Sequence, residues 1–285
     1  MECTRMSDCP LISVVTVSYQ AENTIEKTIK SVLYQTYSNI EYIFKDGVSK
    51  DNTNNIIDKY EIALKDRGIN TKHIISKDTG IYNAMNQSLK YCEGKYIIFL
   101  NADDEFYCDS TLKDIFDSTF QYGDADIIYG DADFVDPPLH FLWKGNMNIV
   151  KERCPFCHQS SFVKTQWIAR HPFDETLYIV ADYDFIYRSF IEKASFCYVD
   201  QIISKFNRGG VSGTRLVKNR WEHRTVQLRY NEKEERKMLR RLKFLLILLN
   251  AYAQEIFFKV VPLKVSAKIR HMNKKRKMSL IRREV

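Results

Sequence analysis

The stretch ISVVTVSYQAENTIEKTIKSVLYQTYSNIEYIFKD, residues 12–46, decides the fold class of this chain. It belongs to an apolar run, residues 11–18, rich in β-branched side chains and typical of a strand buried on both faces. The apolar residues of 25–33 then follow the spacing of one helix face, and residues 40–44 form a second apolar run. A buried strand, a helix and another buried strand predict a βαβ unit on a parallel sheet.

The same alternation continues to about residue 130. Further strands are expected at 73–76, 96–100 and 126–129, and further helices near 53–64, 81–89 and 112–116. The predicted fold class is therefore α/β, with a mostly parallel sheet, helices on both faces and a helical extension at the C-terminal end. Beyond residue 130 the pattern loosens. We expect irregular chain at 141–150, a helix at 183–193, two short strands at 196–199 and 202–206, and one long charged helix at about 214–243.

The positive charge of the chain is concentrated at its end. The 285 residues carry a net charge of +7, yet 264–285 hold nine Lys or Arg residues against Glu284 alone. The preceding 263 residues hold 34 basic and 35 acidic side chains, so the fold itself offers no basic groove and no nucleic-acid partner is expected for it. Seven cysteines, an odd number without framework-like spacing, fit a reducing cytosol.

An apolar stretch at 244–263 precedes this basic tail. It begins FLLILL, but Glu255 and Lys259 lie inside a window that a membrane-spanning helix needs to be almost wholly apolar. The pattern instead predicts an interfacial helix and a polybasic tail, residues 244–285, that bind an anionic membrane surface.

Acidic residues follow three of the predicted strands. Asp46 comes after the second strand, Asp78 after the third, and Asp103 and Asp104 directly after the fourth. In an open α/β sheet the ligand lies beyond the carboxyl ends of the strands, so these acids are expected to face one crevice. Neither a G-x-G-x-x-G nor a Walker motif is present to bind phosphate. A paired carboxylate can bind phosphate through a hard divalent cation, which leaves Asp46 and Asp78 as acceptors for ribose hydroxyls or a base N–H.

Two segments carry a family resemblance. SVVTVSYQAENTIEKTIKSVLYQTYSNIEYIFKDGVSKDNT at 13–53 and SKDTGIYNAMNQSLKYCEGKYIIFLNADD at 76–104 closely resemble the family 2 glycosyltransferases, which have the GT-A fold. The resemblance is strong over about 12–135 and weaker over 155–215. It departs from the family at Asn101, where many members have the first Asp of the metal motif, and at Val48 and Lys50, where small residues are common.

The resemblance implies a nucleotide diphosphate sugar as donor, with a UDP-sugar expected, and assigns residues to it. Tyr19 and Asp46 would contact the nucleoside, with Asp78 nearby. Asp103 and Asp104 would hold Mg²⁺ or Mn²⁺, and Asp103 would also contact the donor.

Inverting transfer also needs a base that takes the proton of the acceptor hydroxyl. By resemblance this is Asp182, with Asp184 as the fallback, although an acid in the first turn of a helix is also favoured simply by the helix dipole. His158 in the run HQS would contact the acceptor or a phosphate. The run CPFCH at 154–158 matches a haem-attachment pattern, but two buried thiols are the favoured interpretation.

The predicted protein is an inverting, metal-dependent glycosyltransferase acting on a saccharide or lipid-linked saccharide in surface polysaccharide assembly. Residues 1–240 would form the catalytic domain, with a donor half at about 11–135 and an acceptor half at about 136–215, while 241–285 would associate with the membrane. Family and tail together imply a cytoplasmic protein, peripheral on the cytoplasmic face of the inner membrane. The alternatives are a sugar nucleotidyltransferase, which would need a Gly-rich basic loop after the first strand, and a non-enzymatic scaffold that uses the tail to bind membrane or nucleic acid.

Overall fold

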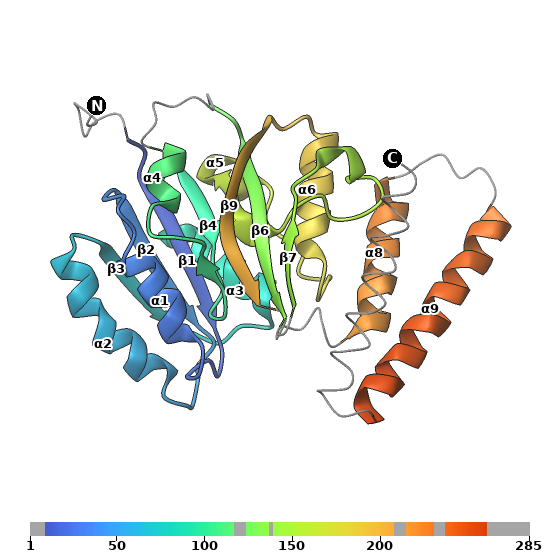
Figure 1. The fold of residues 1–285 in the computed structure, drawn as a ribbon, viewed down its shortest axis with the longest axis horizontal. Coiled ribbons are helices and arrows are strands. Elements are labelled where there is room, and N and C mark those ends of the chain that lie inside the picture. The colour runs from blue at the N-terminus through green and yellow to red at the C-terminus, as the bar shows by residue number, and fades with distance from the viewer. Residues whose placement is uncertain (1–8, 117–123, 137–138, 208–214, 231–236, 261–285) are drawn as a thin grey trace.

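The computed structural model describes residues 9–116, 124–136, 139–207, 215–230 and 237–260, and these build one α/β unit with a pair of helices at its side (Figure 1). Its sheet has the order β3-β2-β1-β4-β8-β6-β9-β5, with β7 paired to β6. The strands are β1 Ile12–Ser18, β2 Ile40–Asp46, β3 Asn70–Ile75, β4 Tyr96–Phe99, β5 Glu105–Phe106, β6 Ile127–Asp136, β7 Leu139–Trp143, β8 Ser161–Lys164 and β9 Phe196–Asn207. The helices are α1 Ile25–Leu33, α2 Thr53–Asp66, α3 Ile81–Ser88, α4 Thr111–Phe116, α5 Thr165–Arg170, α6 Ala181–Ile191, α8 Leu216–Tyr230 and α9 Lys237–Val260.

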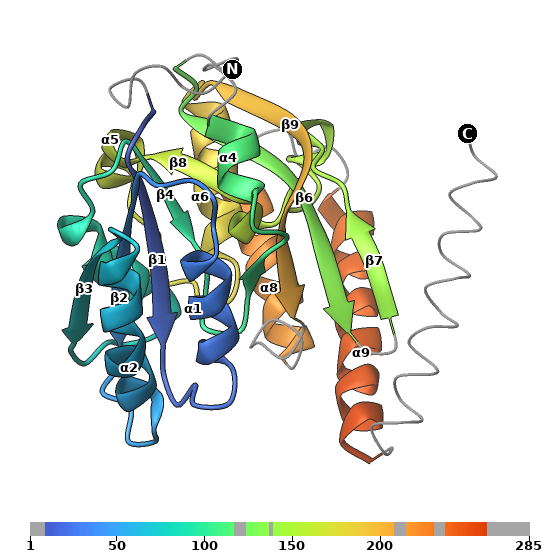
Figure 2. The same ribbon diagram turned by 60° about the vertical axis from the view of Figure 1, so that its left-hand side comes forward.

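The first half of the sheet is parallel, as the sequence predicts. β1 pairs with β2 and β4, and β2 pairs with β3, all in the same direction, so the carboxyl ends of four strands meet at one edge. Along β1, Ile12 and Val14 enter a core shared with α1, α2 and α4, while Val15 and Val17 enter a second core shared with α3, α5, α6 and α8. Each such side chain stabilises the fold by about 1.5–3 kcal/mol when fully buried. Helices therefore cover both faces of the sheet (Figure 2).

The second half of the sheet is mixed, and two local predictions are wrong there. Residues 141–143, expected to be irregular, belong to β7, which pairs with β6. The two short strands expected at 196–199 and 202–206 are one strand, β9, which pairs in parallel with β6. Its register shifts opposite Tyr129–Ala132, so the polar pair Asp200–Gln201 is accommodated by an irregularity in the ladder instead of a turn.

The predicted single helix at 214–243 is also wrong. The structure has two helices, α8 and α9, which lie side by side (Figures 1 and 2), with the ring centroids of Trp221 and Phe244 5.9 Å apart. The run of Glu, Lys and Arg between them favours helix throughout and contains no Gly or Pro to mark a boundary. No helix in the described part of the chain is long and apolar enough to cross a membrane. The basic tail predicted at 264–285 lies outside the described residues.

Candidate active site at the strand ends

Tyr19, Gly47 and Asp78 lie together where β1, β2 and β3 end. A Cβ atom placed on Gly47 would come within 2.9 Å of Asp78 Oδ2 and 3.2 Å of Tyr19 Cδ2. Any larger residue at position 47 would therefore displace Asp78 or Tyr19, whose side chains come from the neighbouring loops. Tyr19 is 67% exposed, so its side chain is accessible to a flat ligand such as a base.

Asp46 is fully buried, and its carboxylate is hydrogen-bonded to the surrounding strand and loop. Its carboxylate accepts hydrogen bonds from Ser18 Oγ (2.8 Å), Ser49 N (2.6 Å), Ser49 Oγ (2.7 Å) and Asn54 Nδ2 (3.2 Å). The sequence predicted a nucleoside contact for this residue, but in the structure both oxygens are occupied by the strand and loop around it. Asp46 therefore fixes the shape of the loop that follows β2.

Asp78 forms an ion pair with the buried cation Lys45. Lys45 Nζ lies 2.9 Å from Asp78 Oδ2 and also donates to the carbonyls of Ser76 (2.7 Å) and Asp46 (3.2 Å). Because Lys45 is fully buried and Asp78 is only 16% exposed, the pair ties the end of β3 firmly to β2.

The loops after β1 and β2 are further joined by side chains that accept backbone N–H groups. Gln20 N donates to Ser49 Oγ (2.9 Å), Ala21 N to Thr53 Oγ1 (2.8 Å) and Glu22 N to an oxygen of Asp51 (3.0 Å). The two loops that carry Tyr19 and Gly47 thus form one hydrogen-bonded unit.

Asp103 and Asp104 follow β4, as predicted, but their environments differ. Asp104 is fully buried and its Oδ2 accepts a hydrogen bond from Gln159 Nε2 at 3.0 Å. Asp103 is partly buried, and this burial raises the pKa of its carboxyl, with an opposing effect from nearby His158. A carboxylate whose charge is disfavoured by burial is suited to a nearby cation.

A metal held by protein side chains alone is not supported in the described part of the chain. No three His, Cys, Asp or Glu side chains gather there closely enough to hold an ion. However, Asn101 Oδ1 is buried without a described hydrogen-bond partner two residues before Asp103. An unpartnered acceptor oxygen two residues from a desolvated carboxylate would suit a hard cation whose remaining ligands came from a bound diphosphate.

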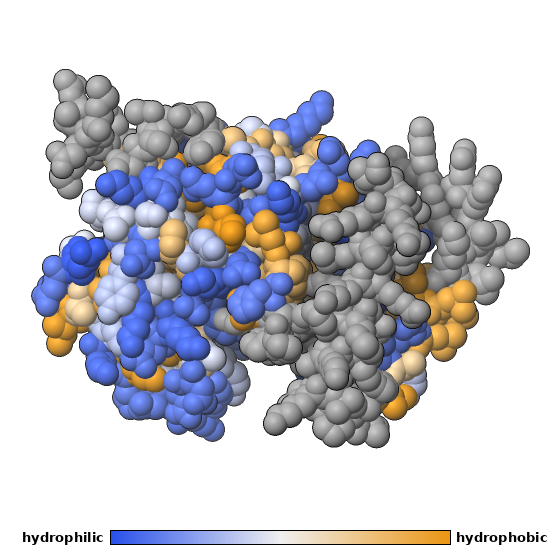
Figure 3. All heavy atoms as spheres, in the orientation of Figure 1, coloured by the Kyte–Doolittle hydropathy of each residue, from blue (hydrophilic) through white to orange (hydrophobic). Residues whose placement is uncertain are grey.

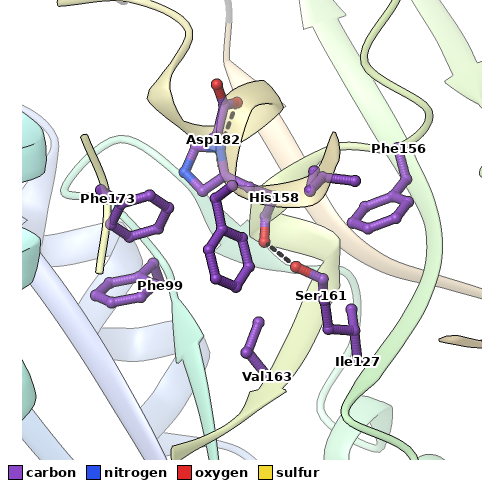
Figure 4. Close-up of a pocket in the computed structure, with 10 residues that line it drawn as sticks. Phe99, Ile127, Phe156, His158, Ser161, Val163, Phe173 and Asp182 are labelled. Atoms are coloured by element: carbon purple, nitrogen blue, oxygen red, sulfur yellow. Dashed lines mark hydrogen bonds and ion pairs between the residues drawn. The ribbon is translucent and has the colours of Figure 1, made fainter. Parts of the chain in front are cut away.

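Asp182 lies in the first turn of α6, and three donors reach its carboxylate. His158 Nδ1 lies 3.2 Å from Oδ2, while the Tyr82 hydroxyl at 3.1 Å and Tyr183 N at 2.8 Å donate to Oδ1. Figure 4 shows the carboxylate above the His158 ring. Burial opposes ionisation most strongly, but His158 and Tyr183 N outweigh it and lower the pKa of Asp182. Asp182 is therefore a carboxylate at neutral pH, able to accept a proton.

His158 offers one further nitrogen. Because a carboxylate only accepts, Nδ1 carries the proton toward Asp182. Its Nε2 atom is buried without a hydrogen-bond partner among the described residues. Beneath the ring lies a small cavity of about 10 Å³, too small for a sugar, with mostly apolar walls (Figure 4). Its lining residues are Phe99, Ile127, Phe156, His158, Ser161, Val163, Phe173, Asp182, Phe185 and Ile186.

Asp184, the fallback base, faces away from this site. It is 1% exposed, its Oδ1 lies 2.7 Å from Arg229 Nη1, and the Tyr230 hydroxyl donates to it at 3.0 Å. These partners come from α8, which the sequence indicated only as a charged helix. The same helix brings His223 against Tyr183, with ring centroids 4.9 Å apart, so His223 is part of the site's surroundings and no solvated surface residue.

The two thiols of CPFCH are unreactive in this setting. Cys154 Sγ donates to Phe156 O and Cys157 Sγ to Gln159 Oε1, and burial raises the pKa of both. Both cysteines are free. These thiols accordingly support the interpretation as packing residues.

A parallel sheet with acids at its strand ends, followed by a mixed half that supplies a further carboxylate, defines a glycosyltransferase of GT-A type. Residues 13–184 match the family model described as glycosyl transferase family 2. The chain therefore belongs to glycosyl transferase family 2.

Curated relatives and solved structures agree with this family. A PGL/p-HBAD biosynthesis glycosyltransferase of Mycobacterium bovis is 28% identical over 218 residues, 73% of this chain and 82% of the relative. The UDP-Glc:alpha-D-GlcNAc-diphosphoundecaprenol beta-1,3-glucosyltransferase WfaP of Escherichia coli is 42% identical over 95 residues, 33% of this chain and 36% of the relative.

Among solved structures, S. aureus TarS 1-349 in complex with UDP-GlcNAc superposes with a TM-score of 0.62 at 18% identity, over 89% of this chain and 76% of that one. A longer TarS chain matches over 43% of its length. The mannosyltransferase PcManGT of Pyrobaculum calidifontis, in complex with GDP-Man and Mn²⁺, gives 0.64 at 13% identity, over 96% of this chain and 81% of that one. At these identities the structures show the shared fold.

Proposed function

We propose that this glycosyltransferase transfers a sugar, with inversion, from a UDP-sugar to a saccharide or lipid-linked saccharide in cell-surface polysaccharide assembly. The observation that carries the proposal is the link between Tyr82 and Asp182. Tyr82 belongs to α3, which follows Asp78 of the proposed donor loops, and this contact supports Asp182 as a base close to the donor.

The proposed step needs one base and one leaving group. The acceptor oxygen attacks the anomeric carbon and forms the new glycosidic bond, while the bond from that carbon to the diphosphate oxygen breaks. Asp182 takes the proton of the acceptor hydroxyl, and the nucleoside diphosphate leaves with the electron pair. The exposed edge of His158, whose side chain is 16% exposed, would contact the acceptor or a phosphate.

On the donor side, Tyr19 would stack on the base and Asp78 would accept from the nucleoside, with Asp46 holding the loop between them. For the metal, we propose Asp103 as the side chain that touches Mg²⁺ or Mn²⁺ and Asp104 as the neighbour that fixes the turn through Gln159. A divalent cation bound there would neutralise the charge of the diphosphate. The Mn²⁺ and UDP-GlcNAc named for the superposed structures, and the UDP-Glc in the name of the E. coli relative, support these choices.

The donor proposal is tested by titrating UDP- and GDP-sugars into the purified full chain with Mn²⁺ and with EDTA, by calorimetry and by nucleotide release. Asp103→Asn should abolish the Mn²⁺-dependent part of donor binding. The matched control Asp109→Asn, at an exposed acid in the same region, should bind like the parent chain. If donor affinity is the same with Mn²⁺ and with EDTA, donor binding does not need the proposed metal. If no sugar nucleotide binds, the proposed donor is wrong.

We also propose that residues 244–285, which comprise most of α9 and the tail, hold the enzyme on the cytoplasmic face of the membrane, and that residues 1–240 form the catalytic unit. α9 begins at Lys237, close to this boundary. Its exposed apolar residues gather on one side of the molecule (Figure 3) and are Leu245, Leu246, Ile247, Leu249, Tyr252 and Ile256. An amphipathic helix next to nine basic residues suits an anionic surface, where a lipid-linked acceptor would be found.

Flotation with anionic and with zwitterionic vesicles tests this attachment. The parent chain should float with anionic vesicles at low salt, and Leu246→Glu with Leu249→Glu should remain at the bottom of the gradient. Ile62→Glu, at a 72% exposed isoleucine of α2, is the control and should float. A parent chain that does not bind anionic vesicles overturns the membrane assignment and leaves the proposed chemistry standing.

A further inference from the structure

Helix α8 lies beyond residues 13–184, where the chain matches its family, yet it packs against the helix that carries Asp182. Val226 of α8 is fully buried in the core shared with α6. Arg229 and Tyr230 at the end of α8 bind Asp184, and Tyr230 packs on Tyr187 with ring centroids 5.0 Å apart. The C-terminal part of α8 is thus tied to the middle of α6.

The middle of α8 is tied to the start of α6 through one buried acid. Glu222 is 6% exposed, and its carboxylate accepts three backbone N–H groups. Tyr178 N donates at 3.1 Å to Oε1, while Ile179 N at 2.7 Å and Val180 N at 3.3 Å donate to Oε2. These residues lead directly into Ala181, where α6 begins.

Such contacts control the direction of a helix start. The first N–H groups of a helix and the turn before it have no partners within the helix, so a side chain that accepts them fixes the entering chain. Val180, the residue at the cap position, provides no side-chain cap of its own. The acid that accepts these N–H groups comes instead from α8, and a negative charge is favoured at this end of the helix.

The turn fixed in this way carries the proposed base. Asp182 follows Val180 by two residues, and the Tyr82 hydroxyl, which donates to Asp182 Oδ1, also lies 2.8 Å from Ile179 O. Glu222 and Tyr82 therefore hold the same turn. Glu222 accepts hydrogen bonds from its backbone N–H groups, whereas the Tyr82 hydroxyl contacts the carbonyl oxygen of Ile179 and the carboxylate of Asp182.

We infer that Glu222 is a positioning residue for the transfer reaction: it sets the turn 178–182 so that Asp182 meets the acceptor hydroxyl. The inference rests on the proposed role of Asp182 as the base. Glu222 touches no substrate and acts through the backbone. A displacement of about 1 Å at a reacting group is enough to lower a rate substantially, so loss of this clamp acts on kcat.

The first test compares kcat and donor affinity in Glu222→Gln and Glu222→Ala. The glutamine keeps one acceptor oxygen but presents an amide N–H₂ to a backbone N–H, and the alanine removes all three bonds. We expect kcat to fall about tenfold in Glu222→Gln and further in Glu222→Ala, while the dissociation constant of the donor changes less than about twofold, because the donor loops lie on β1–β3.

Two controls separate positioning from general stability. Gln35→Ala removes a 1% exposed side chain that also makes three hydrogen bonds to backbone, with Ser31 O, Cys108 O and Leu112 N, away from both parts of the site. It should lower the melting temperature like a Glu222 variant but leave kcat unchanged. Thr225→Ala changes an exposed residue of the same helix, whose hydroxyl donates to Trp221 O, and should leave both quantities unchanged. If Gln35→Ala lowers kcat as much as Glu222→Gln does, the effect is one of stability and the inference is wrong.

A double-mutant cycle with Asp182→Asn then distinguishes the two claims. If Glu222 acts through Asp182, Glu222→Gln causes no further loss in the Asp182→Asn background. Full additivity overturns the positioning role and leaves the base intact. Full activity of Asp182→Asn alone overturns the base, and with it the proposed function on which the inference depends.

Discussion

The two parts of the site are held in different ways. On the proposed donor side, Tyr19, Gly47 and Asp78 follow neighbouring parallel strands, and the loops are joined by bonds among themselves, with Asp46 and Lys45 buried beneath them. On the side of the proposed base, Asp182 stands at a helix start that is fixed from outside by α3, by the HQS turn and by α8. The donor side is thus a property of the sheet edge, whereas the base side depends on how separate helices pack. Changes to the two parts should therefore have different kinetic signatures.

The largest expected effect is that of Asp182→Asn. An amide cannot take the proton of the acceptor hydroxyl, so kcat should fall by about 10²–10⁴-fold. Donor affinity should stay unchanged because the donor loops do not include Asp182. Steady-state kinetics and calorimetry with the donor measure the two quantities, and the exposed change Asp200→Asn serves as the matched control. If the folded Asp182→Asn chain keeps full activity, Asp182 is not the base.

Asp46→Asn should give the opposite signature. The amide would place an N–H₂ group against donors that now point at a buried carboxylate, so the loop after β2 loses its anchor. We expect a free energy of unfolding lower by about 1–3 kcal/mol and a donor KM raised about tenfold, with kcat at saturating donor much less affected. Denaturant unfolding and donor titration check this, with Asp66→Asn at the exposed end of α2 as control. A fall in kcat at constant KM would show that Asp46 affects the chemical step, so that changes to the two sides do not have different kinetic signatures.

The smallest effect is expected from His158→Phe, and it is a shift in pH dependence. The titratable groups near Asp182 include His158, Tyr82, His223, Cys154 and Cys157, and although burial opposes ionisation, the contact with His158 lowers the pKa of Asp182. With His158 removed, burial prevails and the pKa rises, so the acid limb of kcat should move to higher pH. In the parent chain the lowered pKa stabilises the fold above the ordinary pKa of an aspartate, and this is lost as pH falls through the folded value. The free energy of unfolding of His158→Phe should therefore depend less on pH in that range.

His73→Phe is the matched control for this pH dependence, because His73 Nδ1 lies 3.1 Å from Asp58 in a similar pair on β3, away from Asp182. It should leave the acid limb in place. An unshifted limb in His158→Phe would mean that His158 does not set the charge of Asp182, and the difference between the two sides would then rest on geometry alone.

The local sequence pattern was sufficient to predict the positions of the strand-end acids on the proposed donor side. Strands buried on both faces and helices between them place Asp46, Asp78 and Asp103 at one edge whatever the details of packing. It did not show that Asp46 and Asp104 turn inward, because the direction of a loop carboxylate depends on donors such as Ser49, and Gln159 lies in a different segment. The split of the charged C-terminal stretch into α8 and α9 was missed for a related reason, since helix-favouring residues continue through it.

By itself, the sequence determined the α/β class, the family, the acids at the strand ends and the position of Asp182, because each follows from periodicity or from a contiguous motif. Only the tertiary structure decided which of those acids remain at the surface and which serve the fold. Only it brought Glu222, His158 and Tyr82 to the turn that carries Asp182. The physical reason is that a strand end is placed by backbone pairing, which repeats along the chain. A helix start is placed by side chains from distant segments, and their partners are chosen by packing.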